Sequence, residues 1–246
     1  MKARRRTRRS LRVRLRAYWA IGIILLGAAV YAGYRAVEWP GFALNDVAVS
    51  GATVTPRSEI LRAAGLQAHG NIWLQNLGAA RSRIEALPYV RTARLLRRPP
   101  GTILIQITER TPDGCLVGRD GAAARIDDEG RVLEAGCGSG RLRRYWSRLV
   151  IPEPGTFVRD ASVLRLQADA QALAGDGHVY VGFAHDRFGD LQATLPSGVV
   201  VLFGAEGDIQ QKARLVAPIL RETSARGAAI AAIDLRAPRT PVVRYK

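Results

Sequence analysis

The strongest hydropathy pattern in the chain is a basic run followed by an uncharged apolar stretch. Residues 1–16 contain nine Lys and Arg and no acid, and residues 17–34 contain no charged side chain. At a rise of about 1.5 Å per residue, a helix over residues 17–37 is about 31 Å long. This length matches the roughly 30 Å hydrocarbon core of a bilayer. Because Lys and Arg are retained on the cytoplasmic side, the pattern predicts a cytoplasmic tail over 1–16, a single transmembrane helix over 17–37 and an exported remainder.

Two other interpretations fit part of this segment. In a cleavable signal peptide, Val30-Tyr31-Ala32 would resemble the small-residue cleavage site, but the long basic lead and the length of the apolar stretch favour a retained anchor. A nucleic-acid-binding arm would explain the basic run, yet it would not require an uncharged stretch of membrane length. The exported part keeps 27 basic against 21 acidic residues, so most of the excess charge lies in the tail.

Residues 38–112 alternate strand and helix patterns in a compact order. We expect a strand over 46–49, a helix from the cap Thr55 and Pro56 to Gly65, and an extended stretch over 71–74. A second helix ends before Pro88, with an apolar stripe of Leu77, Ala80, Ile84 and Leu87. Strands over 90–96 and 102–108 follow, the latter with alternating Ile103, Ile105 and Ile107. The order is β-α-β-α-β-β, which predicts an α+β domain.

Residues 113–246 carry short strand patterns with two helices and predict a second, mixed β domain. A hairpin over 124–133 turns at Asp127, Asp128 and Glu129, which we expect to be solvated because their spacing does not fit a calcium loop. The other expected elements are a helix over 161–174, strands over 179–183, 191–195, 199–203 and 230–236, and a helix over 208–226 kinked at Pro218.

The residues of the first domain resemble the POTRA module of the FtsQ/DivIB cell-division proteins. Three features carry the resemblance: Gly51 after the first strand, the step Leu87-Pro88-Tyr89-Val90, and the strand from Pro100 to Pro112. The second domain resembles the β domain that follows POTRA in FtsQ, through the hairpin from Leu195 to Gly204, the helix beginning near Lys212, and Ile233-Asp234-Leu235-Arg236. The resemblance implies a bitopic divisome scaffold without catalysis, which recruits FtsB-like and FtsL-like partners at the septum.

No motif for catalysis, cofactor or metal binding stands in the sequence. GxSxG, HExxH, SxxK, P-loop and GxGxxG patterns are missing, and His178 and His185 have no motif partner. Cys115 and Cys137 make neither a zinc site nor a CxxC motif. A disulfide between them and two separate thiols both fit, since the sequence does not give their Cα separation.

The C-terminal segment is the candidate binding site. Pro238 and Pro241 remove amide donors, so the segment suits a sheet edge, where a partner strand would add and Arg236 or Arg239 would meet partner carboxylates. Prolines also protect an edge that has no partner. In FtsQ proteins this strand receives the FtsB-like partner, which favours binding, although Ala237 replaces the aromatic often found there. The predicted site is Arg236, Ala237, Pro238, Arg239, Thr240, Pro241, Val242, Val243 and Arg244.

Two alternative functions come from other classes. A POTRA-containing component of envelope assembly or polypeptide transport would usually carry repeated modules or a large membrane barrel, and the sequence has no second copy of the module. An exported hydrolase is the other alternative, and the missing motifs weaken it.

Overall fold

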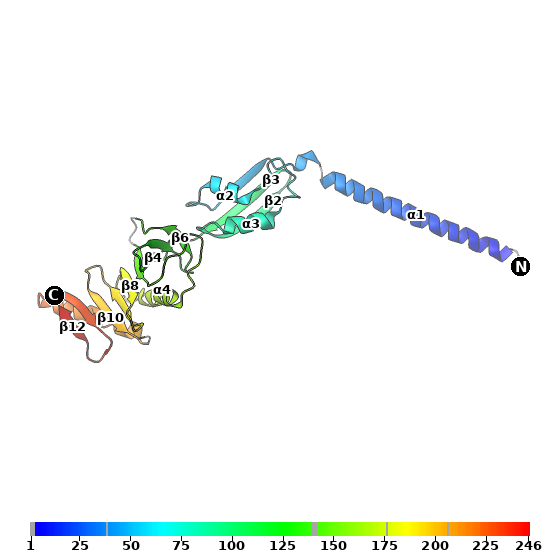
Figure 1. Cartoon of the computed structure of the whole chain (residues 1–246). Coiled ribbons are helices and arrows are strands. Elements are labelled where there is room, and N and C mark those ends of the chain that lie inside the picture. Colours follow the sequence, from blue (N-terminus) through cyan, green and yellow to red (C-terminus); the bar gives the residue numbers. More distant parts are fainter. Residues whose placement is uncertain (1–2, 38, 139–141, 176, 206) are drawn as a thin grey trace. The chain divides into compact units, whose positions relative to one another are not determined.

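The structure, a computed structural model, describes residues 3–37, 39–138, 142–175, 177–205 and 207–246, with only the backbone described in 3–16 and 36–37 (Figure 1). The chain divides into two compact units. Residues 1–84 and 92–108 form the first unit, and residues 85–91 and 109–246 form the second. The division falls inside two strands, because the stretches 85–91 and 109–110 pack with the second unit.

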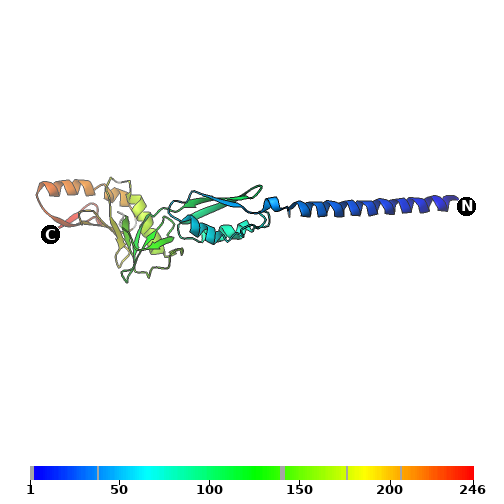
Figure 2. The ribbon, with the colours of Figure 1, turned by 90° about the horizontal axis from the view of Figure 1, so that it is seen from above.

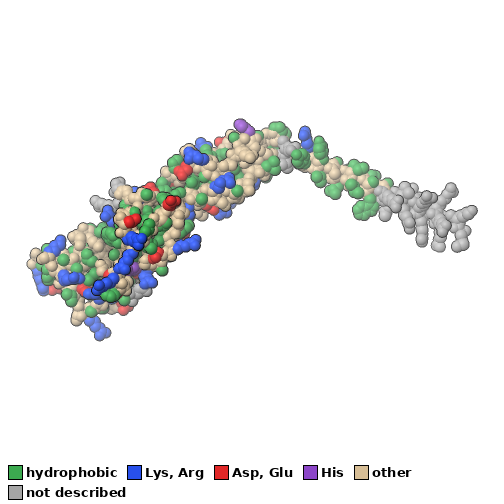
Figure 3. Space-filling model, viewed as in Figure 1, with side chains coloured by type: hydrophobic (Ala, Val, Ile, Leu, Met, Phe, Trp, Pro, Cys, Tyr) green, Lys and Arg blue, Asp and Glu red, His purple; other side chains and the backbone are tan. Residues whose placement is uncertain are grey.

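The N-terminal helix α1 (Ala3–Val37) contains the expected apolar segment. Its segment Ala17–Arg35 has a mean hydropathy of 1.6, and none of it is buried. Figure 3 shows apolar side chains along this part of the helix. By length and composition, α1 is long and apolar enough to cross a membrane.

The rest of the first unit is a three-stranded sheet with two helices on one side (Figure 2). Its strand order is β1-β3-β2, with β1 parallel to β3. Ile103, Ile105 and Ile107 of β3 are buried as expected from their alternation. The elements are a 3₁₀ turn (Pro40–Phe42), β1 (Asp46–Ser50), α2 (Arg57–Ala64), α3 (Leu77–Glu85), β2 (Val90–Arg98) and β3 (Thr102–Glu109).

The glycines predicted to end local elements of the first unit do so. Gly51 follows β1 with φ of 81°, and a Cβ there would lie 2.1 Å from the carbonyl oxygen of Ile107. Gly65 ends α2 in the left-handed conformation, where its N–H bonds the carbonyl of Leu61. Glycine is therefore required at Gly51, where a side chain would not fit, and is favoured at Gly65, where φ is positive.

Two local predictions in the first unit were wrong. Pro56, not Thr55, holds the cap position of α2, because its extended backbone (φ −60°, ψ 137°) leaves Arg57 as the first helical residue. Residues 71–74, predicted to be extended, form a turn. One β-bridge, between Ala43 and Asn71, joins this turn to the segment that precedes β1. The side chain of Asn71 accepts a hydrogen bond from the N–H of Trp73 (2.8 Å), which stabilises the turn.

The second unit is a nine-stranded sheet with its helices over one face (Figure 2). The strand order is β12-β11-β10-β9-β8-β7-β4-β5-β6. Its strands are β4 (Gly114–Val117), β5 (Ala123–Ile126), β6 (Val132–Ala135), β7 (Arg143–Trp146), β8 (Gly182–His185), β9 (Leu191–Thr194), β10 (Val200–Gly204), β11 (Ile230–Asp234) and β12 (Val242–Tyr245). The helices are α4 (Ala161–Leu173), α5 (Ile209–Ala213) and α6 (Val216–Ala225). One apolar core joins the helices to the sheet, with Tyr145, Leu166, Phe203 and Ile233 among its buried members.

The second unit also departs from two expectations. The strand expected over 179–183 begins at Gly182. The single helix expected over 208–226 is two helices, α5 and α6, separated at Arg214 and Leu215. Pro218 explains the break, because proline lacks the N–H that would bond the carbonyl of Arg214, four residues earlier, and its ring clashes with that carbonyl.

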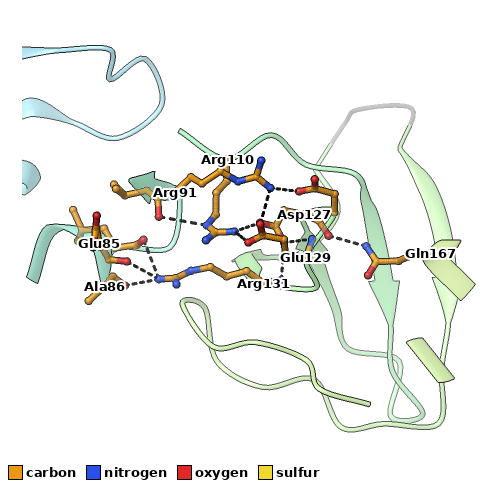
Figure 4. Close-up of polar contacts among 11 residues, drawn as sticks. Glu85, Ala86, Arg91, Arg110, Asp127, Glu129, Arg131 and Gln167 are labelled. Carbon is orange, nitrogen blue, oxygen red and sulfur yellow. Dashed lines mark hydrogen bonds and ion pairs between the residues drawn. The ribbon is translucent and has the colours of Figure 1, made fainter. Parts of the chain in front are cut away.

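The sequence predicts that the acidic turn of the β5–β6 hairpin is solvated, but only part of the turn is exposed. The side chain of Asp127 is fully buried and pairs with Arg110, whose side chain is 6% exposed (Figure 4). The other oxygen of Asp127 accepts the backbone N–H groups of Glu129 (3.0 Å) and Arg131 (2.7 Å). Glu129, half exposed, also bonds Arg110 (2.7 Å), and this contact lowers the pKa of Glu129. A buried cation therefore holds the turn in place.

Arg131 connects the same hairpin to the segment over 85–91. Its Nη2 donates to the carbonyls of Ala86 (2.9 Å), Glu85 (3.2 Å) and Leu87 (3.2 Å) (Figure 4). Burial, followed by repulsion from Arg110, lowers the pKa of Arg131. The two guanidinium groups lie 5.3 Å and 5.1 Å from the centre of the Phe157 ring, which supplies cation–π attraction to both.

Cys115 of β4 and Cys137, just after β6, are joined as a disulfide with a Cα separation of 5.4 Å. That separation is usual for a disulfide. The bond closes a loop that contains β5, the acidic turn and β6.

We expect Asp127→Asn to lower the free energy of unfolding by about 3 kcal/mol, since it removes the charge partner of the buried Arg110. The matched control is Asp128→Asn in the same turn, whose carboxylate pairs with Arg91 but is half exposed. An exposed pair contributes no more than about 1 kcal/mol, so the control should change little. Urea denaturation followed by circular dichroism measures both, and equal losses would contradict a dominant role for the buried pair.

For the disulfide, protein exported to an oxidising compartment should have an intact mass lower by two hydrogen atoms than that of the reduced protein. Thiol labelling should find no reactive thiol in it. The double variant Cys115→Ala with Cys137→Ala should lose about 3 kcal/mol of stability, as expected for a closed loop of this length. Reduction of the native protein should reproduce that loss. Quantitative labelling of both thiols in unreduced, exported protein would show that the bond does not form.

Candidate functional site at the β12 edge

Strand β12 is the last strand in the order of the nine-stranded sheet. It pairs antiparallel with β11 on one side, with Val243 opposite Ile233 and Val242 opposite Asp234. An edge strand directs a row of backbone N–H and C=O groups away from its own sheet. β12 therefore offers a template on which a further strand can pair.

The opposite edge of the sheet, β6, is covered by its own chain. The N–H of Val132 bonds the carbonyl of Thr156 (2.9 Å), the N–H of Gly155 bonds the carbonyl of Val132 (2.7 Å), and Arg131 forms a bridge with Phe157. Across the part of the chain that the structure describes, no segment covers β12 in the same way. The two edges thus differ in their availability for pairing.

Within β12, Val243 is the one side chain that is not exposed. Val243 packs against the apolar core of the second unit, while Val242 is 56% exposed. Tyr245, which lies outside the predicted site, belongs to the strand and is half exposed. Its sequence signal is a β-branched and aromatic composition, since Tyr245 closely follows Val242 and Val243.

Five of the predicted site residues form a connecting turn and are not part of the strand. Ala237, Pro238, Arg239, Thr240 and Pro241 are all exposed, and the N–H of Thr240 bonds the carbonyl of Ala237 (3.0 Å). Both prolines precede the strand, so neither removes a donor from the β11–β12 ladder.

Arg236 is held by its own chain. Its Nε donates to Oδ1 of Asp234 (3.0 Å) and its Nη2 to Oδ2 (2.6 Å), a bidentate pair. The stem of Arg236 packs over Gly204, where an added Cβ would lie 2.9 Å from Cγ of Arg236. The hydrogen bond from Arg236 lowers the pKa of Asp234. The pair therefore contributes stability above the usual carboxylate range and loses it only as the pH falls through the lowered pKa.

The edge carries a positive charge beyond this pair. Arg239 in the turn and Arg244 on β12 are exposed, and among the described residues neither belongs to an ion pair within 4 Å. Arg244 lies opposite Ala232 and still contributes to lowering the pKa of Asp234. An extended segment with acidic side chains would complement this edge.

The histidines and carboxylates elsewhere do not assemble a metal cluster within the described residues. His185, at the end of β8, contacts Asp169 of α4 (3.2 Å between Nε2 and Oδ2). The sequence gives no signal for this contact, because the two residues are 16 positions apart and share no motif. The contact joins the helix to the sheet and is largely buried.

A groove of about 880 Å³ opens beside α4 and the beginnings of β7 and β8. Apolar residues such as Leu173, Val179 and Phe183 line most of it, together with Arg143, Arg144 and His178. These residues do not include a serine, cysteine or carboxylate that would act as a nucleophile beside a base.

Comparison with known proteins agrees with this architecture. Residues 42–110 match the family model described as POTRA domain, FtsQ-type. The cell division protein FtsQ of Myxococcus fulvus is 29% identical over 234 residues, which cover 89% of this chain and 80% of the relative. FtsQ of Mycolicibacterium smegmatis is 28% identical over 98% of this chain and 67% of its own. FtsQ of Caulobacter vibrioides (strain NA1000 / CB15N) is 32% identical over 44% of this chain and 36% of its own.

The FtsQ-type match covers the first sheet and its helices, and the longer matches extend through the second unit to most of the chain. Together with the mixed α+β fold and the apolar N-terminal helix, these matches make the chain similar to FtsQ cell-division proteins over most of its length.

Proposed function

We propose that this chain is a non-enzymatic, single-pass membrane scaffold of the division machinery. Helix α1 anchors it in the cytoplasmic membrane, with the basic tail inside and both compact units outside, at the division septum. The basic residues before the apolar segment support this orientation, because such residues are retained on the cytoplasmic side. Its role is to bring FtsB-like and FtsL-like bitopic partners to the septum.

The observation that carries the proposal is the contrast between the two edges of the second sheet. β6 is covered by the segment around Thr156, whereas β12 presents a free edge among the described residues. In the proposed complex an extended partner segment pairs with β12, and the backbone hydrogen bonds supply the affinity. Val242 and Tyr245, both half exposed, provide apolar contacts along the strand.

The charges along the edge refine the roles suggested by the sequence. Because Arg236 already pairs with Asp234, its role in the proposal is to hold the turn after β11. Arg239 and Arg244 are the groups assigned to partner carboxylates. The proposed partner segment is therefore acidic, with a short extended region.

The test is binding of the full-length protein, in lipid nanodiscs, to an acidic extracytoplasmic segment of an FtsB-like protein. Truncation after Arg236 should abolish saturable binding, because it removes β12. Double charge reversal, Arg239→Glu with Arg244→Glu, should weaken binding several-fold, since each exposed ion pair contributes roughly 0.2–1 kcal/mol. Isothermal titration calorimetry or fluorescence anisotropy measures each affinity.

The matched control is Arg221→Glu on the exposed side of α6, which changes the same kind of charge away from β12. It should bind like the unaltered protein. Circular dichroism should show that each variant keeps its fold. Equal binding by the full-length and truncated forms would exclude the β12 edge as the site, and no binding by either would remove the main support for the partner assignment.

A further inference from the structure

Exposed apolar side chains gather next to the end of α1, and the proposed function uses none of them. Trp39, Trp73 and Leu74 are 58%, 45% and 73% exposed. The ring of Phe42 lies between the two tryptophans, 5.4 Å from Trp39 and 6.0 Å from Trp73, with edge-to-face geometry. We call these four residues the aromatic patch.

The patch is supported by hydrogen bonds on both sides. The N–H of Leu44 bonds the carbonyl of Gly70 (2.8 Å), and the N–H of Ile72 bonds the carbonyl of Phe42 (2.9 Å). The chain leaving α1 is thus paired with the turn that carries Trp73 and Leu74.

The side chains of Ile72 and Arg97 also hold this turn. Ile72 is fully buried, so its side chain anchors the turn in the core of the first unit. Arg97 donates from Nε to the carbonyl of Ile72 (2.7 Å) and from Nη2 to that of Gln75 (2.8 Å). These contacts hold the turn in one conformation, and in that conformation Trp73 and Leu74 are exposed.

The covalent chain keeps this patch close to the end of the membrane span. Trp39 follows the last helical residue, Val37, by two positions, and two residues reach at most about 7 Å. The apolar segment ends at Arg35, and two further helical residues rise only about 3 Å. This bound on Trp39 applies whatever angle the first unit makes with α1.

We propose that the aromatic patch contacts the headgroup–acyl boundary of the membrane that α1 crosses. Tryptophan favours this boundary because its ring is apolar while its N–H finds a polar partner there. The headgroup layer adds about 5–7 Å on each side of the hydrocarbon core, which is within reach of the short tether. The inference rests on the anchoring role of α1 in the proposed function, and adds a second membrane contact beside the helix.

A test uses the full-length protein in vesicles of zwitterionic and anionic phospholipid. Leu74→Cys introduces the one free thiol, because Cys115 and Cys137 form a disulfide. An environment-sensitive fluorophore is attached to this thiol. We expect the emission to shift to shorter wavelength on reconstitution and to be lost when the lipids carry bromine or a nitroxide near the headgroup. Unaltered protein treated with the same reagent reports any background labelling.

Two matched positions make the result decisive. Ile24→Cys lies in α1, 68% exposed, and should be quenched by quencher placed on the lipid chains. Val54 is 55% exposed in the first unit and follows the C-terminal end of β1. A fluorophore on Val54→Cys should remain in water. Because the vesicles contain no other protein, quenching at Leu74 identifies lipid as the contact.

If Ile24 is quenched and Leu74 behaves like Val54, the aromatic patch does not contact the membrane, and the inference is overturned while the anchor stands. If Ile24 is not quenched, α1 does not span the bilayer, and the inference falls together with the anchoring role. Binding to β12 is measured separately and does not depend on either outcome.

Discussion

The second unit depends on one buried ion pair, between Arg110 and Asp127. Arg110 follows directly after β3, and Asp127 opens the turn between β5 and β6. Because a buried carboxylate is stable only when its charge and lone pairs are satisfied, Asp127 combines the guanidinium with two backbone N–H groups. The hairpin at one end of the nine-stranded sheet is thereby held, and Arg131 extends the same network to the carbonyls of residues 85–87.

Much of the fold could be predicted from the sequence, because regular alternation carries the information. The isoleucines of β3, the stripe of α4 and the glycines after β1 and α2 all fulfil their expected roles. These features depend on a residue's own period and conformational limits. They are therefore visible without knowledge of what lies across the sheet.

The failures share a different cause. Asp127 looked like a solvated acid, since nothing near it in sequence reveals a cation 17 residues earlier. The pairing of His185 with Asp169 was missed for the same reason. At the candidate site, sequence placed the edge strand in the right region, but the turn over 237–241 and the pairing of Arg236 with Asp234 required the fold. Side-chain contacts between distant segments are the part that periodicity does not encode.

The disulfide between Cys115 and Cys137 has a consequence for the route the chain takes. In the proposed topology the second unit is synthesised in a reducing compartment and must cross the membrane as an extended chain. Without the crosslink, the loop that contains Asp127 opens more easily on the side of synthesis. In that topology the bond closes only after export, so the domain is easiest to unfold before translocation and hardest to unfold afterwards.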